Sequence, residues 1–174
     1  MKNKKTLIFT SSLKFRDIEL DLIQFIRNND NYHTIFVVDT IEDKIFYNKN
    51  FPNCADEIKI SSNEFDYLSQ NYDKEKLIKK ALKIEQKFEC SIYRLFMIDR
   101  IIGRGLHASG GFYHPKTRLA SDTSHFDILN IAVNRIEFWE DLFKGYNVKL
   151  VLNLPQIANR LAKLHNINAQ SLYI

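Results

Sequence analysis

The residues best suited to chemistry gather in one stretch, residues 91–118, which reads SIYRLFMIDRIIGRGLHASGGFYHPKTR. Four of the five glycines of the chain lie here, so the backbone can adopt positive φ or approach another group closely. Asp99 is the only acid in the stretch. The stretch also holds the basic residues Arg94, Arg100, Arg104, His107, His114, Lys116 and Arg118 and the tyrosines Tyr93 and Tyr113. This composition predicts a shaped basic loop that holds an anionic or sugar-like ligand.

Two interpretations stay open for the basic residues of this loop. Arg100 and Arg104 form either a guanidinium fork for phosphate or carboxylate, or an internal ion pair with Asp99. His107 and His114 supply either a general base or structural hydrogen bonds. No third ligand stands at metal-binding spacing from the two histidines, so no metal is expected, and no catalytic residue is assigned.

The elements that position this loop have the pattern of an α/β protein. Apolar runs predict strands at 5–10, 34–39, 148–154 and 169–174, with a shorter strand-like piece at 57–60. A helix is predicted between the first two strands from the spacing of Phe15, Ile18, Leu22, Phe25 and Ile26. Because strand, helix and strand follow within about 35 residues, we expect a Rossmann-like, mostly parallel sheet flanked by helices. The rest of 40–72 is expected to be irregular.

Three further helices are predicted. Asp73 caps one that runs to about Phe88, with a solvated lysine face and with Leu77, Ile78, Ala81 and Leu82 turned inward. Ser124 and Asp127 form a capping box for a long helix that Gly145 closes as the C′ residue. The apolar stripe of that helix is Phe126, Leu129, Val133, Ile136 and Phe143. Phe138, Trp139 and Phe143 are interpreted as core, with a membrane-facing or partner-facing patch as the alternative. Pro155 opens the last helix.

Several classes of protein are disfavoured. The turn after the first strand, residues 10–16, has no glycine, so the dinucleotide fingerprint is absent, and no Walker A loop occurs. A nucleotide contact through Ser11 and Ser12 is a minor alternative. No apolar run approaches the roughly 20 residues of a membrane span, and Cys54 and Cys90 are read as reduced thiols of a cytoplasmic protein. The net charge of +4 is compatible with an anionic ligand, nucleic acid or membrane surface.

Asp99 to Gly105 (DRIIGRG), followed by an aromatic residue, a proline and a Phe/Trp-rich helix, resembles bacterial capsular-polysaccharide and surface-carbohydrate biosynthesis proteins. These are similar to two-Rossmann-domain (GT-B) glycosyltransferases. The segments 148–153 and 157–169, with Tyr173 and Ile174, resemble the last β-α-β unit of their N-terminal domain. The resemblance implies that residues 1–174 form a single Rossmann-like domain, the acceptor-side half of a larger protein.

On this resemblance Asp99, Arg100, Gly103, Arg104 and Gly105 line the cleft between the two domains, and the composition of the loop adds His107, Gly110, Gly111 and His114 as substrate-binding candidates. The expected partners are a saccharide or phosphorylated acceptor and a second α/β domain that holds a nucleotide-sugar donor. No cofactor is expected in this chain, and the isolated chain is expected to be inactive. Peripheral contact with the inner face of the membrane is a further expectation, and nucleic acid is not expected. The alternatives are a self-contained binding module for an anionic ligand and the N-terminal half of a sugar-nucleotide epimerase.

Overall fold

The computed structural model describes residues 4–11, 16–61, 71–96 and 124–171. Within it the chain forms two compact units, one made of residues 1–63 and 138–174 and the other of residues 64–137. The boundary between the units falls inside one long helix, α7 (His125–Gly145).

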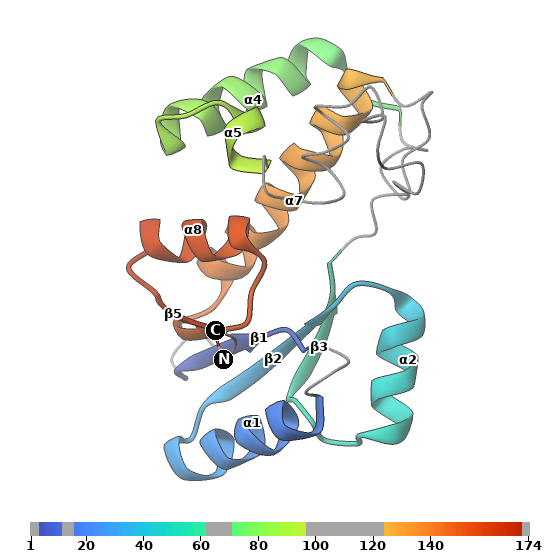
Figure 1. Cartoon of the computed structure of the whole chain (residues 1–174), viewed down its shortest axis with the longest axis vertical. Coiled ribbons are helices and arrows are strands. Elements are labelled where there is room, and N and C mark those ends of the chain that lie inside the picture. Colours follow the sequence, from blue (N-terminus) through green and yellow to red (C-terminus); the bar gives the residue numbers. More distant parts are fainter. Residues whose placement is uncertain (1–3, 12–15, 62–70, 97–123, 172–174) are drawn as a thin grey trace, which may run out of the picture. The chain divides into compact units, whose positions relative to one another are not determined.

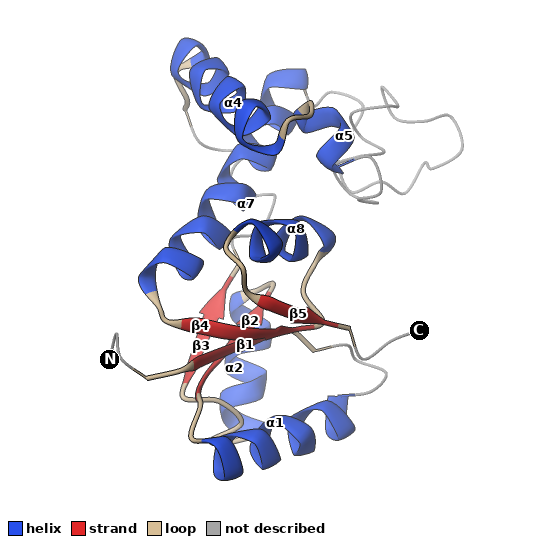
Figure 2. Cartoon of the chain, turned by 90° about the vertical axis from the view of Figure 1, so that its left-hand side faces the viewer, coloured by secondary structure: helices blue, strands red, loops and turns tan. Residues whose placement is uncertain are grey.

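The first unit is built on a five-stranded parallel sheet (Figures 1 and 2). The strands are β1 (Thr6–Phe9), β2 (His33–Val38), β3 (Glu57–Ile60), β4 (Val148–Leu152) and β5 (Asn168–Gln170), in the order β3-β2-β1-β4-β5. The central strand β1 pairs with β2 on one side and with β4 on the other, so that Ile8 lies between Ile35 and Val151. The predicted α/β class, the parallel pairing and the positions of the first four strands are confirmed. The last strand was predicted at 169–174 and covers Asn168–Gln170, with residues 172–174 outside the described part of the chain.

Helices cover both faces of this sheet, which explains the continuous apolar runs Leu7–Phe9 of β1 and Ile35–Val38 of β2. Helices α1 (Arg16–Asp30) and α2 (Ile41–Asn50) lie on one face, and α8 (Gln156–Leu164) lies on the other with the second half of α7 (Figure 2). The face under α1 and α2 buries Leu7, Phe9, Leu20, Ile23, Phe36, Val38, Tyr47 and Leu152. The rings of Phe9 and Phe36 stack there with their centroids 4.6 Å apart. On α7, Trp139 and Phe143 are buried, which confirms their interpretation as core, whereas Phe138 is only half-buried.

Two predictions for this unit are wrong. Helix α2 lies in a segment that was expected to be irregular; it begins at a sequence-local signal, since Thr40 caps it by accepting a hydrogen bond from the backbone N–H of Asp43. Helix α1 packs on Leu20 and Ile23, and Ile26 of the predicted stripe is partly buried against the same core. Ile18 and Phe25 of that stripe are 70% and 64% exposed, and Phe15 lies outside the described residues. The true buried stripe includes a charged residue, Glu19, which a purely apolar pattern cannot reveal.

The second unit contains α4 (Lys74–Phe88), α5 (Ile92–Phe96) and the first part of α7. Asp73 caps α4 by accepting from the N–H groups of Glu75 and Lys76, as predicted. The predicted capping box is also present, because Ser124 and Asp127 each accept a hydrogen bond from the other's backbone N–H.

Two details of these helices differ from prediction. Leu77 and Ala81 of α4 are buried, but Ile78 and Leu82 are exposed. Gly145 is the last residue of α7 and lacks the left-handed backbone of a C′ residue. Among the described helices, none is both long enough and apolar enough to cross a membrane.

The edge strand β3 is tied to β2 by a carboxylate at its start. The Oδ2 atom of Asp56 accepts hydrogen bonds from the N–H and the hydroxyl of Thr34, at 2.8 and 2.9 Å. The other carboxylate oxygen pairs with the guanidinium of Arg27 at 2.6 Å. Burial opposes ionisation of Asp56, but the Thr34 hydrogen bonds and the charges of Arg27 and His33 outweigh it and hold the pKa of Asp56 below its ordinary value.

A carboxyl whose pKa is depressed by folding stabilises the protein above its unfolded pKa of about 3.9 and loses that contribution as the pH falls through the lower folded pKa. Asp56→Asn should therefore lower the free energy of unfolding by about 1–2 kcal/mol at pH 7. The difference from the wild type should shrink as the pH falls below about 4. Urea denaturation between pH 2.5 and 7 measures this, with Asp30→Asn at the exposed end of α1 as the control. A difference that stays constant across this range would contradict the assignment.

Candidate functional site

Polar residues follow the strands at the carboxyl edge of the sheet. Thr10 and Ser11 come after β1, Asp39 after β2, Ser61 after β3 and Asn153 after β4. The chain builds the sheet outward from β1 in one direction through β2 and β3, and later in the other direction through β4 and β5. The order therefore reverses between β1 and β4, and ligands of open parallel sheets bind at the carboxyl ends of the strands beside such a point.

A buried carboxylate joins the two strand ends at this switch point. Glu19, from the first turn of α1, is only 2% exposed. Its Oε2 atom accepts a hydrogen bond of 2.6 Å from the Ser11 hydroxyl, and its Oε1 atom accepts one of 2.9 Å from the side-chain amide of Asn153. The Thr10 hydroxyl donates to the backbone carbonyl of Asn153. We call Thr10, Ser11, Glu19 and Asn153 the switch-point cluster.

The local backbone explains why these residue types are used. Asn153 has φ of 57°, a left-handed conformation that asparagine tolerates better than most residues. That conformation turns the chain sharply between β4 and α8. A carboxylate in the first turn of a helix is also favoured by the helix dipole, which offsets part of the cost of burying Glu19.

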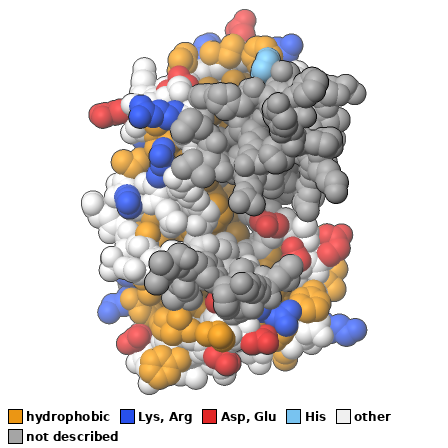
Figure 3. Space-filling model, viewed as in Figure 1, with side chains coloured by type: hydrophobic (Ala, Val, Ile, Leu, Met, Phe, Trp, Pro, Cys, Tyr) orange, Lys and Arg blue, Asp and Glu red, His pale blue; other side chains and the backbone are white. Residues whose placement is uncertain are grey.

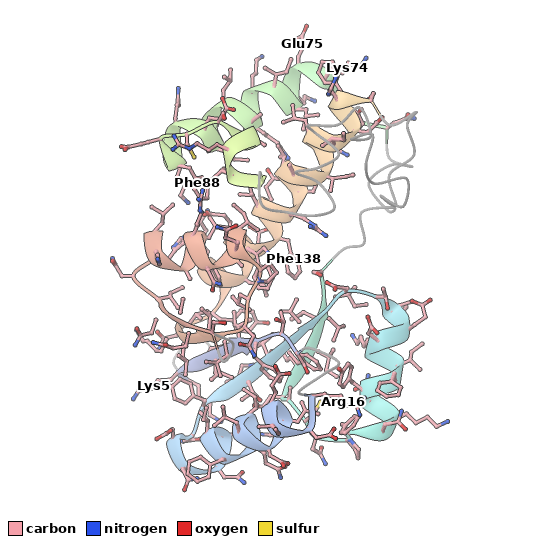
Figure 4. All side chains as sticks on the ribbon, viewed as in Figure 1. Lys5, Arg16, Lys74, Glu75, Phe88 and Phe138 are labelled. Atoms are coloured by element: carbon pink, nitrogen blue, oxygen red, sulfur yellow. The ribbon has the colours of Figure 1, made fainter. Side chains whose placement is uncertain are left out.

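Tyr47 borders the cluster, and Arg16 lies at the start of the helix that carries Glu19. The Tyr47 hydroxyl, on α2, is hydrogen-bonded to Ser11, but burial is the larger effect and raises the pKa of this phenol above its ordinary value, so it stays protonated at neutral pH. Arg16 begins α1, beside α2 (Figure 4), and its guanidinium lies 4.7 Å from the centre of the Phe51 ring and 5.7 Å from that of Phe46. The cation is thus held in place by aromatic faces.

Two cavities lie elsewhere in the first unit. One of about 290 Å³ is lined by α1 and the α2–β3 connection, with Asp17, Asp21, Phe51, Pro52 and Cys54 among its residues. The other, of about 740 Å³, opens at the amino edge of the sheet and is lined by Lys4, His33, Asp56, Glu57 and Tyr146.

The charged groups at the amino edge already pair with one another. Glu57 contacts His33 Nε2 at 2.9 Å, the Tyr146 hydroxyl at 2.9 Å and Lys59 Nζ at 2.8 Å. Burial opposes its ionisation, but these hydrogen bonds together hold the pKa of Glu57 below its ordinary value. We therefore read the amino edge as a structural ion-pair network and the carboxyl edge as the candidate site.

The switch-point cluster offers to a ligand the hydroxyls of Thr10 and Ser11 and the amide of Asn153, which are groups that bind sugar hydroxyls through hydrogen bonds, while the buried Glu19 carboxylate orients them. No group of three or more His, Cys, Asp or Glu side chains suited to a metal ion occurs among the described residues. The arrangement is thus suited to binding and orienting a polar ligand.

The site residues predicted from the sequence lie outside the described part of the chain. This applies to Asp99, Arg100, Gly103, Arg104, Gly105, His107, Gly110, Gly111 and His114. Of the residues found at the carboxyl edge, only Ser11 had been named as a ligand contact. Sequence reasoning missed Glu19 and Asn153, although a polar residue directly after a buried strand, as in Leu152-Asn153, is a signal that would have found the second of them.

Glu19→Ala should reduce the free energy of unfolding by about 2–3 kcal/mol, because it leaves the Ser11 hydroxyl and the Asn153 amide without their buried acceptor. Helix propensity alone would make Glu19→Ala slightly stabilising, because alanine favours the helix, so a lower free energy of unfolding must come from the lost hydrogen bonds. Glu19→Gln keeps the shape and should cost less. Urea denaturation measures both, and Glu42→Ala, an exposed acid in the first turn of α2, is the matched control. A loss no larger than that of the control would mean that the carboxylate does not hold the two strand ends together.

Comparison of the chain with protein-family models, with curated proteins and with solved structures finds no match.

Proposed function

We propose that this α/β domain binds a saccharide or a phosphorylated acceptor at the carboxyl edge of its sheet, as the acceptor-side domain of a glycosyltransferase that acts in surface-polysaccharide biosynthesis. The observation that carries the binding part is the switch-point cluster, which places hydroxyl, amide and carboxylate groups where the strand order reverses. The reaction class comes from the resemblance of Asp99 to Gly105 to surface-carbohydrate biosynthesis proteins.

The chemistry of the edge favours a polyol over a dinucleotide. A dinucleotide requires glycines after the first strand so that the pyrophosphate can approach the backbone, and residues 10–16 contain none. The half-buried Thr10, Ser11 and Asn153 instead present side-chain groups at this turn. Each sugar hydroxyl both donates and accepts hydrogen bonds, so it matches a mixed set of hydroxyl and amide groups.

The roles within the cluster differ in this proposal. Glu19 is too deeply buried to meet a ligand, so it acts as a positioning residue that fixes Ser11 and Asn153. Arg16, held against Phe46 and Phe51, supplies positive charge for a phosphorylated ligand. The nucleotide-sugar donor is held by a second α/β domain, and this chain alone does not transfer sugar.

Titration of the ¹⁵N-labelled chain with methyl glucoside, glucose 1-phosphate and uridine diphosphate tests the proposal. We expect the sugar or the sugar phosphate to shift the backbone amide signals of Thr10, Ser11, Asp39 and Asn153, and uridine diphosphate to shift them less. Ser11→Ala should weaken binding by about 2- to 12-fold, the loss of one neutral hydrogen bond. Ser91→Ala, an exposed serine of the other unit, is the control.

Shifts confined to the amino edge, at His33, Glu57 and Tyr146, would refute the choice of edge. Saturable binding of uridine diphosphate alone at Thr10 and Ser11 would favour a donor-side domain. Sugar transfer by this chain alone, at a rate above that of buffer, would contradict the proposal that the acceptor and the nucleotide-sugar donor bind to two different domains.

A further inference from the structure

Helix α4 carries charge out of proportion to its length. Its 15 residues include six lysines and only two glutamates, Glu75 and Glu85. The helix therefore holds a formal charge of +4, which equals the net charge of the whole chain. The remaining residues carry no net charge overall, so α4 is, with the basic stretch 91–118, one of the two segments in which positive charge is concentrated.

Three adjacent stripes run along α4, each made of two residues one turn apart. Leu77 and Ala81 are buried. Ile78 and Leu82 come next around the helix and are 42% and 52% exposed. Lys79 and Lys83 follow and are exposed. Figure 3 shows basic and apolar side chains next to each other on the surface that α4 forms.

The other lysines of α4 have partners that hold them near the helix. Lys80 pairs with Glu137 at 2.9 Å, Lys76 lies 3.7 Å from the capping Asp73, and the ammonium of Lys74 lies over the ring of Phe126 at 4.9 Å (Lys74 is labelled in Figure 4). Lys79 and Lys83 make no ion pair with any residue in the described part of the chain.

We propose that the exposed face of α4 binds the surface of a lipid bilayer that contains anionic lipids. Lysine ammonium groups are attracted to anionic headgroups, while their alkyl stems and the neighbouring Ile78 and Leu82 side chains enter the boundary between headgroups and acyl chains. A soluble polyanion would satisfy the lysines but would leave the adjacent apolar stripe in water. The pairing of the two stripes therefore favours a bilayer. This proposal does not rest on the switch-point cluster or on the activity proposed above.

Sedimentation of the full chain with vesicles tests the proposal. Vesicles of 70% phosphatidylcholine and 30% phosphatidylserine should bind the protein at low salt, and vesicles of phosphatidylcholine alone should not. Binding should weaken as salt is added, because ions screen the headgroup charge. Lys79→Ala/Lys83→Ala should weaken binding about 25-fold, roughly fivefold for each lysine lost near an anionic surface. Alanine favours the helix, so this variant should keep its fold.

A second variant tests the apolar stripe. Ile78→Gln/Leu82→Gln keeps the charge and replaces exposed side chains only, and it should weaken binding to the same vesicles by about tenfold. Lys49→Ala/Lys163→Ala removes two exposed lysines from the first unit and should bind like the wild type. Circular dichroism and thermal melts of all variants separate loss of binding from loss of folding.

Three outcomes would overturn the proposal. One is no binding to the phosphatidylserine vesicles at low salt. Another is equal weakening by the α4 lysine variant and by the Lys49/Lys163 control. The third is binding of the Ile78/Leu82 variant to the phosphatidylserine vesicles as tight as that of the wild type, which would mean that charge alone attracts the protein to the bilayer. If heparin or a single-stranded oligonucleotide bound tightly through Lys79 and Lys83 while vesicles did not, the partner would be a soluble polyanion.

Discussion

The first unit depends on pairing two strands that the chain makes far apart, and the buried carboxylate of Glu19 secures the end of that pairing. It binds the Ser11 hydroxyl after β1 and the Asn153 amide after β4. A charge buried in this way is costly unless every lone pair that faces the protein finds a donor. The two loops must therefore adopt one mutual geometry, and the candidate site is built on that geometry.

This constraint links folding to binding. The residues that would meet a ligand, Thr10, Ser11 and Asn153, are oriented by contacts that also hold β1 beside β4. The site is therefore organised before any ligand arrives, which lowers the cost of ordering side chains on binding. The amino edge differs, because there the Glu57 carboxylate already forms ion pairs with His33 and Lys59 and accepts a hydrogen bond from Tyr146.

The sequence predicts the sheet well because buried parallel strands consist of continuous apolar runs, such as Leu7-Ile8-Phe9. It predicts caps well because Asp73 and Ser124 act on neighbours within three residues. It fails for α1, where Ile18 and Phe25 have the spacing of a core stripe but are exposed, while the buried Glu19 is an acid that an apolar pattern leaves out. It also fails for α2, where Tyr47 is the only residue of the helix that is fully buried. Glu19 can be buried because Ser11 and Asn153 donate hydrogen bonds to it. Asn153 is 134 positions away in the sequence, so only the folded structure reveals this pairing.

The chain order also bears on how the molecule is assembled during synthesis. Thr10 and Asn153 are 143 positions apart, and the whole second unit lies between them in the sequence. The second unit is continuous, so it can fold from local contacts as soon as it has been made. The first unit can pair β1, β2 and β3 early, but these strands present an unpaired side of β1 until β4 is synthesised. Closing so long a loop adds little to the free-energy cost of folding, because the entropy of closure grows only with the logarithm of loop length. It does slow folding, because contacts between residues distant in sequence form late. Until β4 is synthesised, the unpaired edge of β1 is therefore the place where the nascent chain can most easily pair with a wrong strand.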